Sequence, residues 1–478
     1  MELRDKRIHF VGIGGAGLSA IARVLLERGV EISGSDLALS PVAQALARDG
    51  VRVCIGHEEE NVNDVDLVVR SSAIPVSNVE VQAAHAMGIP VMKRPEFLGR
   101  MMDGQMGVAV AGTHGKTTTT AMIASILLEA ERDPTFIVGG VIAGLDTNAR
   151  TGEGSVFVIE ADEYDRTFLS LRPKVAVVTN VEHDHVDCYP TFDDFRAAFD
   201  EFTALIPPEG LLAACWDDSV ARELGERRRA ADGMTAFFGL GDGAEWRAED
   251  VRPNFAGGVD FLATHGGQTL GLMRLRLPGA HNASNAMAAL AVADFLKVPF
   301  RVVRDALTKF GGVKRRFEIK GEVDGVTVVD DYAHHPTEIE ATLRAARERF
   351  PGGSLWAVWQ PHTYSRTKIL LEDFGQAFDL ADHVILLPIY AARERNTGAP
   401  GSHAISNIDV IAAMEHPDAF YVESLEEAVV QMGAEVRPGD VVLTLGAGDG
   451  NKVGEWLLEA LEAGWLGDGV RGQGRDEH

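Results

Sequence analysis

Hydrophobic and polar positions follow one repeating alternation along most of the chain. A short apolar run, a turn and a longer segment with apolar residues at helical spacing recur, as in RIHFV at residues 7–11 and LSAIARVLLERG at residues 18–29. A second strand-like run, VEISGSD, follows at residues 30–36. Strands that alternate with amphipathic helices are typical of βαβ units around a parallel sheet. The pattern therefore predicts an α/β fold.

Two interruptions of this alternation predict domain boundaries. Residues 101–107, MMDGQMG, show no clear period, and residues 309–318, KFGGVKRRFE, combine glycines with a basic cluster. A chain of 478 residues has room for about three domains. We expect a Rossmann-like domain at residues 1–104, a central domain of P-loop ATPase type with a parallel sheet at residues 105–313, and a Rossmann-like α/β domain at residues 314–478. The polar, glycine-rich residues 465–478 predict a disordered end.

Composition narrows the classes of function. A formal net charge of -26 argues against general binding to nucleic acid or to an anionic membrane, because both need a positively charged face. No apolar run is long enough to span a bilayer, and the charged start MELRDKRIHF leaves no room for the apolar core of a signal peptide. The cysteines, Cys54, Cys188 and Cys215, form no CxxC pair. These features predict a cytoplasmic protein with reduced thiols.

The segment GIGGAG is the first motif that suggests a ligand. It places Gly12, Gly14 and Gly17 in the G-x-G-x-x-G spacing between a strand and a helix, where backbone N–H groups can bind a diphosphate. Asp36 ends the next predicted strand, where dinucleotide-binding folds place an acid for the ribose. Taken alone, the motif favours an NAD-dependent dehydrogenase over glycines that serve only close packing.

A second phosphate-binding motif, AGTHGKTTTT at residues 111–120, changes this interpretation. Gly115, Lys116 and Thr117 have the order of a P-loop, in which the lysine contacts the β and γ phosphates and the hydroxyl reaches magnesium. The strict spacing would require glycine at the position of Val110, so the motif is a variant. The chain therefore contains two predicted phosphate-binding loops.

Two predicted strands of the central domain end in acidic loops. VFVIE, which ends at Glu160, runs into ADEYD, and KVAVVTN runs into VEHDHVD, which contains His183 and His185 among acids. Parallel sheets bind ligands at the carboxyl ends of their strands, and carboxylates together with imidazole can hold a divalent metal ion. We expect magnesium there, with His185 as a ligand and His183 as a solvated loop residue.

Other polar clusters each allow two interpretations. His281, Asn282 and Asn285 begin an Ala-rich helix, where they could contact a purine base or simply cap the helix. The basic run KRR at residues 314–316 could bridge phosphates between domains or form a solvated charged face. At two later strand ends, where a third domain would close on a cleft, lie Asp330, Asp331, Tyr332, His334, His335, His362, Tyr364 and Arg366.

Eight motifs occur together in one order: GIGGAG, AGTHGKTTTT, EADE, TNVEHDHVD, HNASNA, VKRRFE, DDYAHHPTE and QPHTYSR. In this order the sequence resembles the Mur ligases over nearly the whole chain. The resemblance implies an ATP- and Mg²⁺-dependent ligase. It would join L-alanine to the lactyl carboxylate of UDP-N-acetylmuramic acid through an acyl phosphate, in cytoplasmic peptidoglycan precursor synthesis.

The same resemblance assigns roles to individual residues. Catalytic roles would fall to Lys116, Glu160, His185, Arg316, His335 and Arg366. ATP would be bound by Gly112, Thr113, His114, Gly115, Lys116, Thr117, Thr118, His281, Asn282, Asn285, Arg316 and Asp331. The substrates would be bound by Gly14, Gly15, Gly17, Asp36, Ser71, Ser72, Tyr332, His335, His362 and Arg366, with the glycine loop on the UDP diphosphate in place of NAD. Magnesium would be held by Thr117 and Glu160, and a second ion by His185.

Two departures from the family pattern lie near the end of the chain. Thr363 stands where many members have arginine, so one positive contact is expected to be missing, and GAGDGNK at residues 446–452 leaves Gly450 and Asn451 without an assigned role. Three other interpretations remain open: a recycling ligase that attaches a murein peptide to the same sugar nucleotide, an NAD-dependent oxidoreductase, and a non-catalytic nucleotide-binding regulator. A monomer and a homodimer are both compatible with the sequence.

Overall fold

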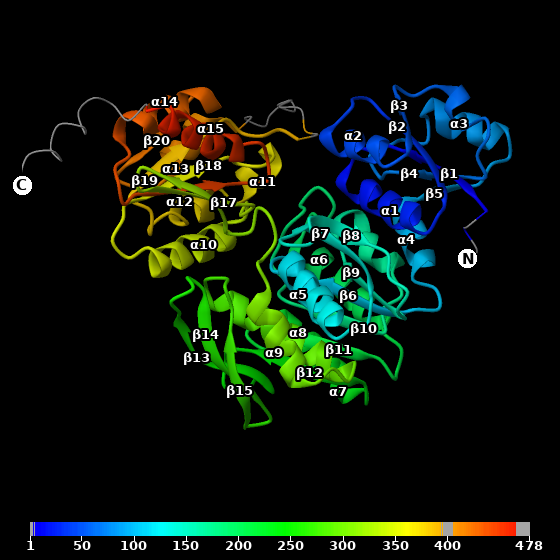
Figure 1. Cartoon of the computed structure of the whole chain (residues 1–478), viewed down its shortest axis with the longest axis horizontal. Coiled ribbons are helices and arrows are strands. Elements are labelled where there is room, and N and C mark those ends of the chain that lie inside the picture. Colours follow the sequence, from blue (N-terminus) through cyan, green and yellow to red (C-terminus); the bar gives the residue numbers. More distant parts are fainter. Residues whose placement is uncertain (1–2, 4, 393, 395–404, 465–478) are drawn as a thin grey trace, which may run out of the picture.

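Three β-sheets, each packed against helices, make up the protein (Figure 1). The computed structural model describes residues 3, 5–392, 394 and 405–464. The predicted disordered end at residues 465–478 lies outside this part of the chain. In the view of Figure 1 the N-terminal and C-terminal sheets lie on opposite sides above the central sheet. The α/β class and the three-part architecture predicted from the sequence are confirmed.

The N-terminal sheet has five parallel strands in the order β3-β2-β1-β4-β5. The order reverses between β1 and β4, which makes the carboxyl ends of these two strands the expected place for a ligand. The glycine loop follows β1 at this point. The elements are β1 (Arg7–Val11), α1 (Ala16–Glu27), β2 (Glu31–Asp36), α2 (Pro41–Arg48), β3 (Arg52–Ile55), η1 (Glu59–Val62), β4 (Leu67–Arg70), α3 (Val79–Ala86), β5 (Val91–Lys93) and α4 (Arg94–Met101).

The central sheet has ten strands in the order β15-β14-β13-β12-β11-β10-β6-β9-β7-β8. Strand β6 lies between β9 and β10, so the loops that follow these three parallel strands meet at one edge of the sheet. The elements are β6 (Met106–Ala111), α5 (Lys116–Glu129), β7 (Thr135–Ile142), β8 (Thr147–Arg150), β9 (Val156–Glu160), η2 (Tyr164–Ser170), β10 (Val175–Val178), α6 (Phe192–Ala204), β11 (Leu211–Cys215), α7 (Ser219–Ala230), β12 (Met234–Gly239), β13 (Trp246–Pro253), β14 (Val259–His265), β15 (Gln268–Arg274), α8 (Ala280–Phe295) and α9 (Phe300–Lys309).

Part of the central sheet is antiparallel, which the expected parallel sheet did not include. Strands β13, β14 and β15 form an antiparallel extension at the lower left of Figure 1, and β8 pairs antiparallel with β7. Strand β13 shows only partial alternation of buried and exposed residues and carries a register shift. This weak period explains why the sequence pattern did not reveal the extension.

The C-terminal sheet has six strands in the order β16-β17-β21-β18-β19-β20, with β16 antiparallel to β17 and the other pairs parallel. The elements are β16 (Glu318–Val323), β17 (Val326–Asp331), α10 (Pro336–Arg349), β18 (Leu355–Trp359), α11 (Tyr364–Ile369), α12 (Leu371–Gln376), β19 (His383–Leu386), α13 (Asn407–Ala413), β20 (Ala419–Tyr421), α14 (Leu425–Glu435), β21 (Val441–Leu445) and α15 (Asn451–Glu462).

The apolar cores show how the sheets are joined. One continuous core runs from the N-terminal sheet into the central sheet, whereas the C-terminal sheet has its own apolar core on each face. The C-terminal part therefore meets the central part mainly through polar side chains, described below. Within the described residues, the helices are too short or too polar to cross a membrane.

Candidate active site

The glycine loop lies at the reversal point of the N-terminal sheet. The Gly14 N–H donates to Asp36 Oδ2 over 2.8 Å, and Gly15 precedes the first residue of α1. Ser71 follows β4, and a Cβ added at Gly12 would lie 3.2 Å from the Ser71 Cβ. The structure therefore brings the glycine loop, Asp36 and the loop after β4 together, as the motif predicts.

Two further side chains complete this group. Ser72 Oγ is buried without a hydrogen-bond partner among the described residues. Arg94, at the start of α4, lies over Gly17, where an added Cβ would clash with Arg94 Nη1. Arg94 also pairs with Asp162 at 3.0 Å. Arg94 links the glycine loop to the central sheet. It was missed because its only sequence signal is its position at a strand end.

The phosphate loop between β6 and α5 is held in shape by its own lysine. Lys116 Nζ donates to the carbonyls of Gly112 and Thr113 over 2.5 and 3.0 Å and lies 2.8 Å from Glu163 Oε1. Gly115 has φ of +78°, and a Cβ there would lie 2.7 Å from Asn285 Oδ1. The left-handed backbone and the close approach of α8 both require glycine at this position.

Glu163 connects the phosphate loop to the loop after β10. It is 1% exposed, and His185 Nε2 lies 3.4 Å from the Oε1 atom that also pairs with Lys116. Burial opposes its charge, but Lys116 and His185 outweigh burial and lower the pKa of Glu163. Burial likewise opposes the charge of Lys116, yet Glu163 raises the pKa of that lysine. From the sequence, Glu163 was one of several acidic residues in the segment ADEYD, and no individual role was predicted for it.

Thr117 and Glu160 meet at the first turn of α5. The Thr117 hydroxyl donates to Glu160 Oε1 over 2.9 Å, and the Gly139 N–H donates to Glu160 Oε2 over 2.6 Å. Burial raises the pKa of Glu160 even though Lys116 and Arg316 act against it. A half-buried carboxylate next to a hydroxyl is a set of oxygen donors that suits a hard divalent cation. His185 does not touch this pair; it belongs to the Glu163 group.

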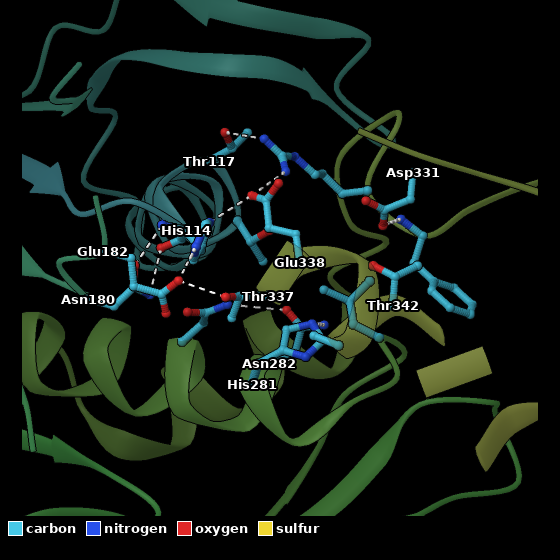
Figure 2. A pocket seen from close by; sticks show the side chains of 17 residues that line it. His114, Thr117, Asn180, Glu182, His281, Asn282, Asp331, Thr337, Glu338 and Thr342 are labelled. Carbon is cyan, nitrogen blue, oxygen red and sulfur yellow. Dashed lines mark hydrogen bonds and ion pairs between the residues drawn. The ribbon is translucent and has the colours of Figure 1, made fainter. Parts of the chain in front are cut away.

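A cavity between the central and C-terminal sheets is lined by residues of both (Figure 2). Burial lowers the pKa of His281 to about 4, so this imidazole is neutral. Asn285 and Asn282 share a hydrogen bond of 3.3 Å. Nine lining residues were predicted from the sequence to bind ATP: His114, Gly115, Thr117, Thr118, His281, Asn282, Asn285, Arg316 and Asp331. The other polar residues of the lining are Asn180, Glu182, Thr337, Glu338 and Thr342.

Arg316 and Asp331 line this cavity from the C-terminal part of the chain. Arg316 Nη2 lies 3.5 Å from Thr117 Oγ1, and its guanidinium lies 5.1 Å from the Tyr332 ring. Asp331 accepts from the N–H groups of Phe317 and Ala333, and burial raises its pKa to about 6. These contacts place the start of the C-terminal part directly against the phosphate loop.

The other two residues of the basic run pair with acidic side chains. Lys314 pairs with Asp146 at 3.3 Å, and Arg315 pairs with the buried Asp330 at 3.0 Å. Arg315 also donates to two carbonyls of the GAGDGNK loop, those of Gly446 and Gly448. Of the three basic residues, Arg316 alone is part of the cavity lining.

A second cavity lies between the loop after β10 and the loop before α11. Arg366 forms a bidentate ion pair with Asp184, with Nη2 2.8 Å from Oδ1 and 3.1 Å from Oδ2. Both side chains are less than a tenth exposed. The sequence predicted that Arg366 binds the substrate. In the structure its guanidinium pairs with Asp184, and its Nη1 lies 3.2 Å from His362 Nδ1. His185 and Thr363 also line this cavity.

Thr363 and His335 occupy positions that the sequence did not indicate. Thr363 begins α11 with φ of +68° and its hydroxyl accepts from the Arg366 N–H. His335 was expected to bind the substrates together with Tyr332, His362 and Arg366. It does not line the second cavity, and its ring is 4.8 Å from that of His114 in the phosphate loop. His335 is placed there because it directly precedes α10, which packs against the central part.

Comparisons with known proteins agree with this arrangement. Three family models match the chain: "Mur ligase family, catalytic domain" at residues 7–106, "Mur ligase middle domain" at residues 110–293 and "Mur ligase, glutamate ligase domain" at residues 315–448. A UDP-N-acetylmuramate--L-alanine ligase of Desulforamulus reducens is 44% identical over 470 residues, covering 97% of this chain and 99% of the relative. One of Geobacter sp. strain M21 is 45% identical, covering 96% and 98%.

Solved structures give the same picture. A UDP-N-acetylmuramate-alanine ligase from Thermotoga maritima is 28% identical, with a TM-score of 0.79 over 96% of this chain and 100% of that one. A murein peptide ligase from Psychrobacter arcticus is 26% identical, with a TM-score of 0.69 over 95% and 98% of the two chains. All three parts of the fold are therefore shared with these enzymes.

Proposed function

This chain belongs to the Mur ligase family, and from that premise we propose that it joins L-alanine to the lactyl carboxylate of UDP-N-acetylmuramic acid, using ATP. One feature of the structure carries this proposal. Glu163 contacts both Lys116 of the phosphate loop and His185 of the second cavity. A phosphoryl group bound at the loop would therefore lie next to a carboxylate bound in the second cavity.

The proposed reaction has two steps, phosphoryl transfer to the carboxylate and then amide formation. The muramyl carboxylate oxygen attacks the γ-phosphorus of ATP, which forms an acyl phosphate and releases ADP. The amine of L-alanine then attacks the acyl carbon, and phosphate leaves as the amide forms and the amine loses its proton. Lys116 and Arg316 would stabilise the charge on the phosphoryl oxygens, because positioning and electrostatics dominate phosphoryl transfer.

Magnesium would be held by Thr117 and Glu160, whose oxygen atoms already face each other at 2.9 Å. His185 would hold a second ion. When bound, Mg²⁺ neutralises charge on the transferred phosphoryl group. The chain's own residues position the rest: Gly112, Thr113 and Gly115 shape the phosphate loop, while His281, Asn282, Asn285 and Asp331 would contact the nucleoside from two sides.

The sugar nucleotide would extend from the N-terminal sheet to the second cavity. Gly14, Gly15 and Gly17 would hold the UDP diphosphate at the helix N-terminus, with Asp36, Ser71 and Ser72 around it. His362 and Arg366 would shape the far end of the site, whereas Tyr332 and His335 do not line the second cavity. A dehydrogenase is not favoured, because it leaves the phosphate loop and its Arg316 contact unexplained. We place the reaction in the cytoplasm, where its soluble substrates are made.

Phosphate release from ATP with Mg²⁺ tests this proposal. UDP-N-acetylmuramic acid would be supplied with L-alanine, with glycine, with L-serine, with a stem tripeptide or with no acceptor. Release that requires both the sugar nucleotide and L-alanine is expected. Preference for the tripeptide would replace the proposal with a recycling ligase, and no release with any acceptor would overturn ligation altogether.

A further inference from the structure

Three side chains beside the nucleotide cavity have the chemistry of a metal site that is separate from the Thr117–Glu160 pair. His114 belongs to the phosphate loop, Glu182 follows β10, and His335 directly precedes α10. One donor atom of each lies within 4.8 Å of the others. The group therefore joins the central part to the C-terminal part. Figure 2 shows His114 and Glu182 facing each other within this cavity.

The two distances from Glu182 in this group are close to those around a small four-coordinate ion. Glu182 Oε2 lies 3.2 Å from His114 Nε2 and 3.6 Å from His335 Nδ1. A tetrahedral Zn²⁺ with bonds of ~2.0–2.2 Å keeps its ligand atoms about 3.3–3.6 Å apart. Two imidazoles and one carboxylate form a donor set that favours Zn²⁺ over Mg²⁺, which prefers oxygen atoms alone.

The partners of these side chains leave the required donor atoms available. His335 is 8% exposed at its side chain, and its Nδ1 has no hydrogen-bond partner among the described residues. The Thr337 hydroxyl donates to Glu182 Oε2 over 2.7 Å and fixes the carboxylate.

Glu338 lies on the opposite side of the His114 ring. Its Oε1 is 3.1 Å from His114 Nδ1. A carboxylate in this position can accept the Nδ1–H when Nε2, the ring nitrogen on the Glu182 side, binds an ion in place of its own proton. Carboxylate, histidine and metal are arranged in this way in many zinc sites, where the outer carboxylate sets the tautomer.

We propose that His114, Glu182 and His335 form a binding site for Zn²⁺ or a similar transition metal ion, with Glu338 orienting His114. An ion bound there ties α10 to the phosphate loop. Because His114 and Glu182 line the nucleotide cavity, the occupied site holds the two parts in one relative position and opposes the exchange of ATP and ADP. The site does not depend on the proposed ligation, so it is tested by direct binding.

Co²⁺ is the probe, added to the full chain without magnesium or nucleotide. Tetrahedral Co²⁺ absorbs visible light far more strongly than octahedral Co²⁺. We expect one equivalent to give the strong band and Zn²⁺ to remove it by displacement. His335→Gln should abolish the band, and Glu338→Gln should weaken binding roughly 10- to 100-fold by loss of the orienting carboxylate.

Three control variants distinguish loss of metal binding from a general folding defect. His281→Gln changes another histidine that lines the same cavity and should retain the band, as should Glu160→Gln. His335→Cys should restore binding with a new sulfur-to-cobalt charge-transfer band, because the longer metal–sulfur bond of about 2.3 Å compensates for the shorter side chain. A band unchanged in His335→Gln, a band lost in Glu160→Gln, or weak octahedral absorption in the natural chain would each overturn the proposal.

Discussion

Replacing Lys116 with methionine tests the link between the phosphate loop and the second cavity. Lys116 is 15% exposed at its side chain and contacts two loop carbonyls and the buried Glu163. Methionine has a similar length and no charge, so the substitution removes the cation with little change in packing. Both stability and turnover should fall, for separate reasons.

The size of each effect follows from the contacts. Leaving a buried charge without its partner costs roughly 3–5 kcal/mol. We expect a loss of about 3 kcal/mol in the free energy of unfolding, because His185 Nε2 stays 3.4 Å from Glu163 and replaces part of the lost attraction. Turnover should fall roughly 100- to 1,000-fold, the usual effect of removing one preorganised donor from a reacting oxyanion.

A double variant separates the two effects. Lys116→Met with Glu163→Gln removes the whole ion pair, and replacing a buried pair by neutral groups is close to neutral for stability. Urea unfolding should therefore show recovery of stability, while phosphate release should stay low. Unchanged stability in the single variant, or near-normal turnover in the double variant, would refute the reasoning.

Three further predictions concern backbone, domain contact and pH. Gly115→Ala should cost at least about 1–2 kcal/mol from the left-handed backbone, plus a clash with Asn285, and should lower both the calorimetric melting temperature and ATP affinity; equal values for the two proteins would contradict this. Arg366→Met should destabilise by roughly 3–5 kcal/mol by leaving Asp184 buried and unpaired, and adding Asp184→Asn should recover most of the loss. Glu182 and Glu338 outweigh burial and raise the pKa of His114 from 6.5 to about 9, so its stabilisation is fully present below pH 6.5 and is lost as pH rises through about 9. Urea unfolding across this window should show a smaller pH slope for His114→Gln, and equal slopes would count against the assignment.

Local patterns predicted the parts of the site that depend on one strand and the loop after it. The order strand, Gly115-Lys116-Thr117, helix was sufficient to place the phosphate loop. Glu160 was identified because it ends a buried strand of a parallel sheet, where side chains meet at one edge. These features need only local spacing and the periodicity of strands and helices.

The remaining features depend on how distant segments pack together. Arg366 and Asp184 are 182 positions apart, and no local spacing indicates that the guanidinium is already neutralised by that carboxylate. The position of His335 beside His114 requires the docking of α10 on the central part. Arg94 becomes part of the site only because α4 packs beside the glycine loop. Sequence spacing does not determine such contacts.

Transfer of ¹⁸O from a labelled lactyl carboxylate tests the central claim most directly. UDP-N-acetylmuramic acid carrying ¹⁸O in that carboxylate would be incubated with ATP, Mg²⁺ and L-alanine, and the released phosphate would be analysed by mass spectrometry. If the carboxylate attacks the γ-phosphorus, each released phosphate contains one oxygen from the sugar nucleotide. Unlabelled phosphate would mean that water attacks ATP, and it would contradict ligation through an acyl phosphate.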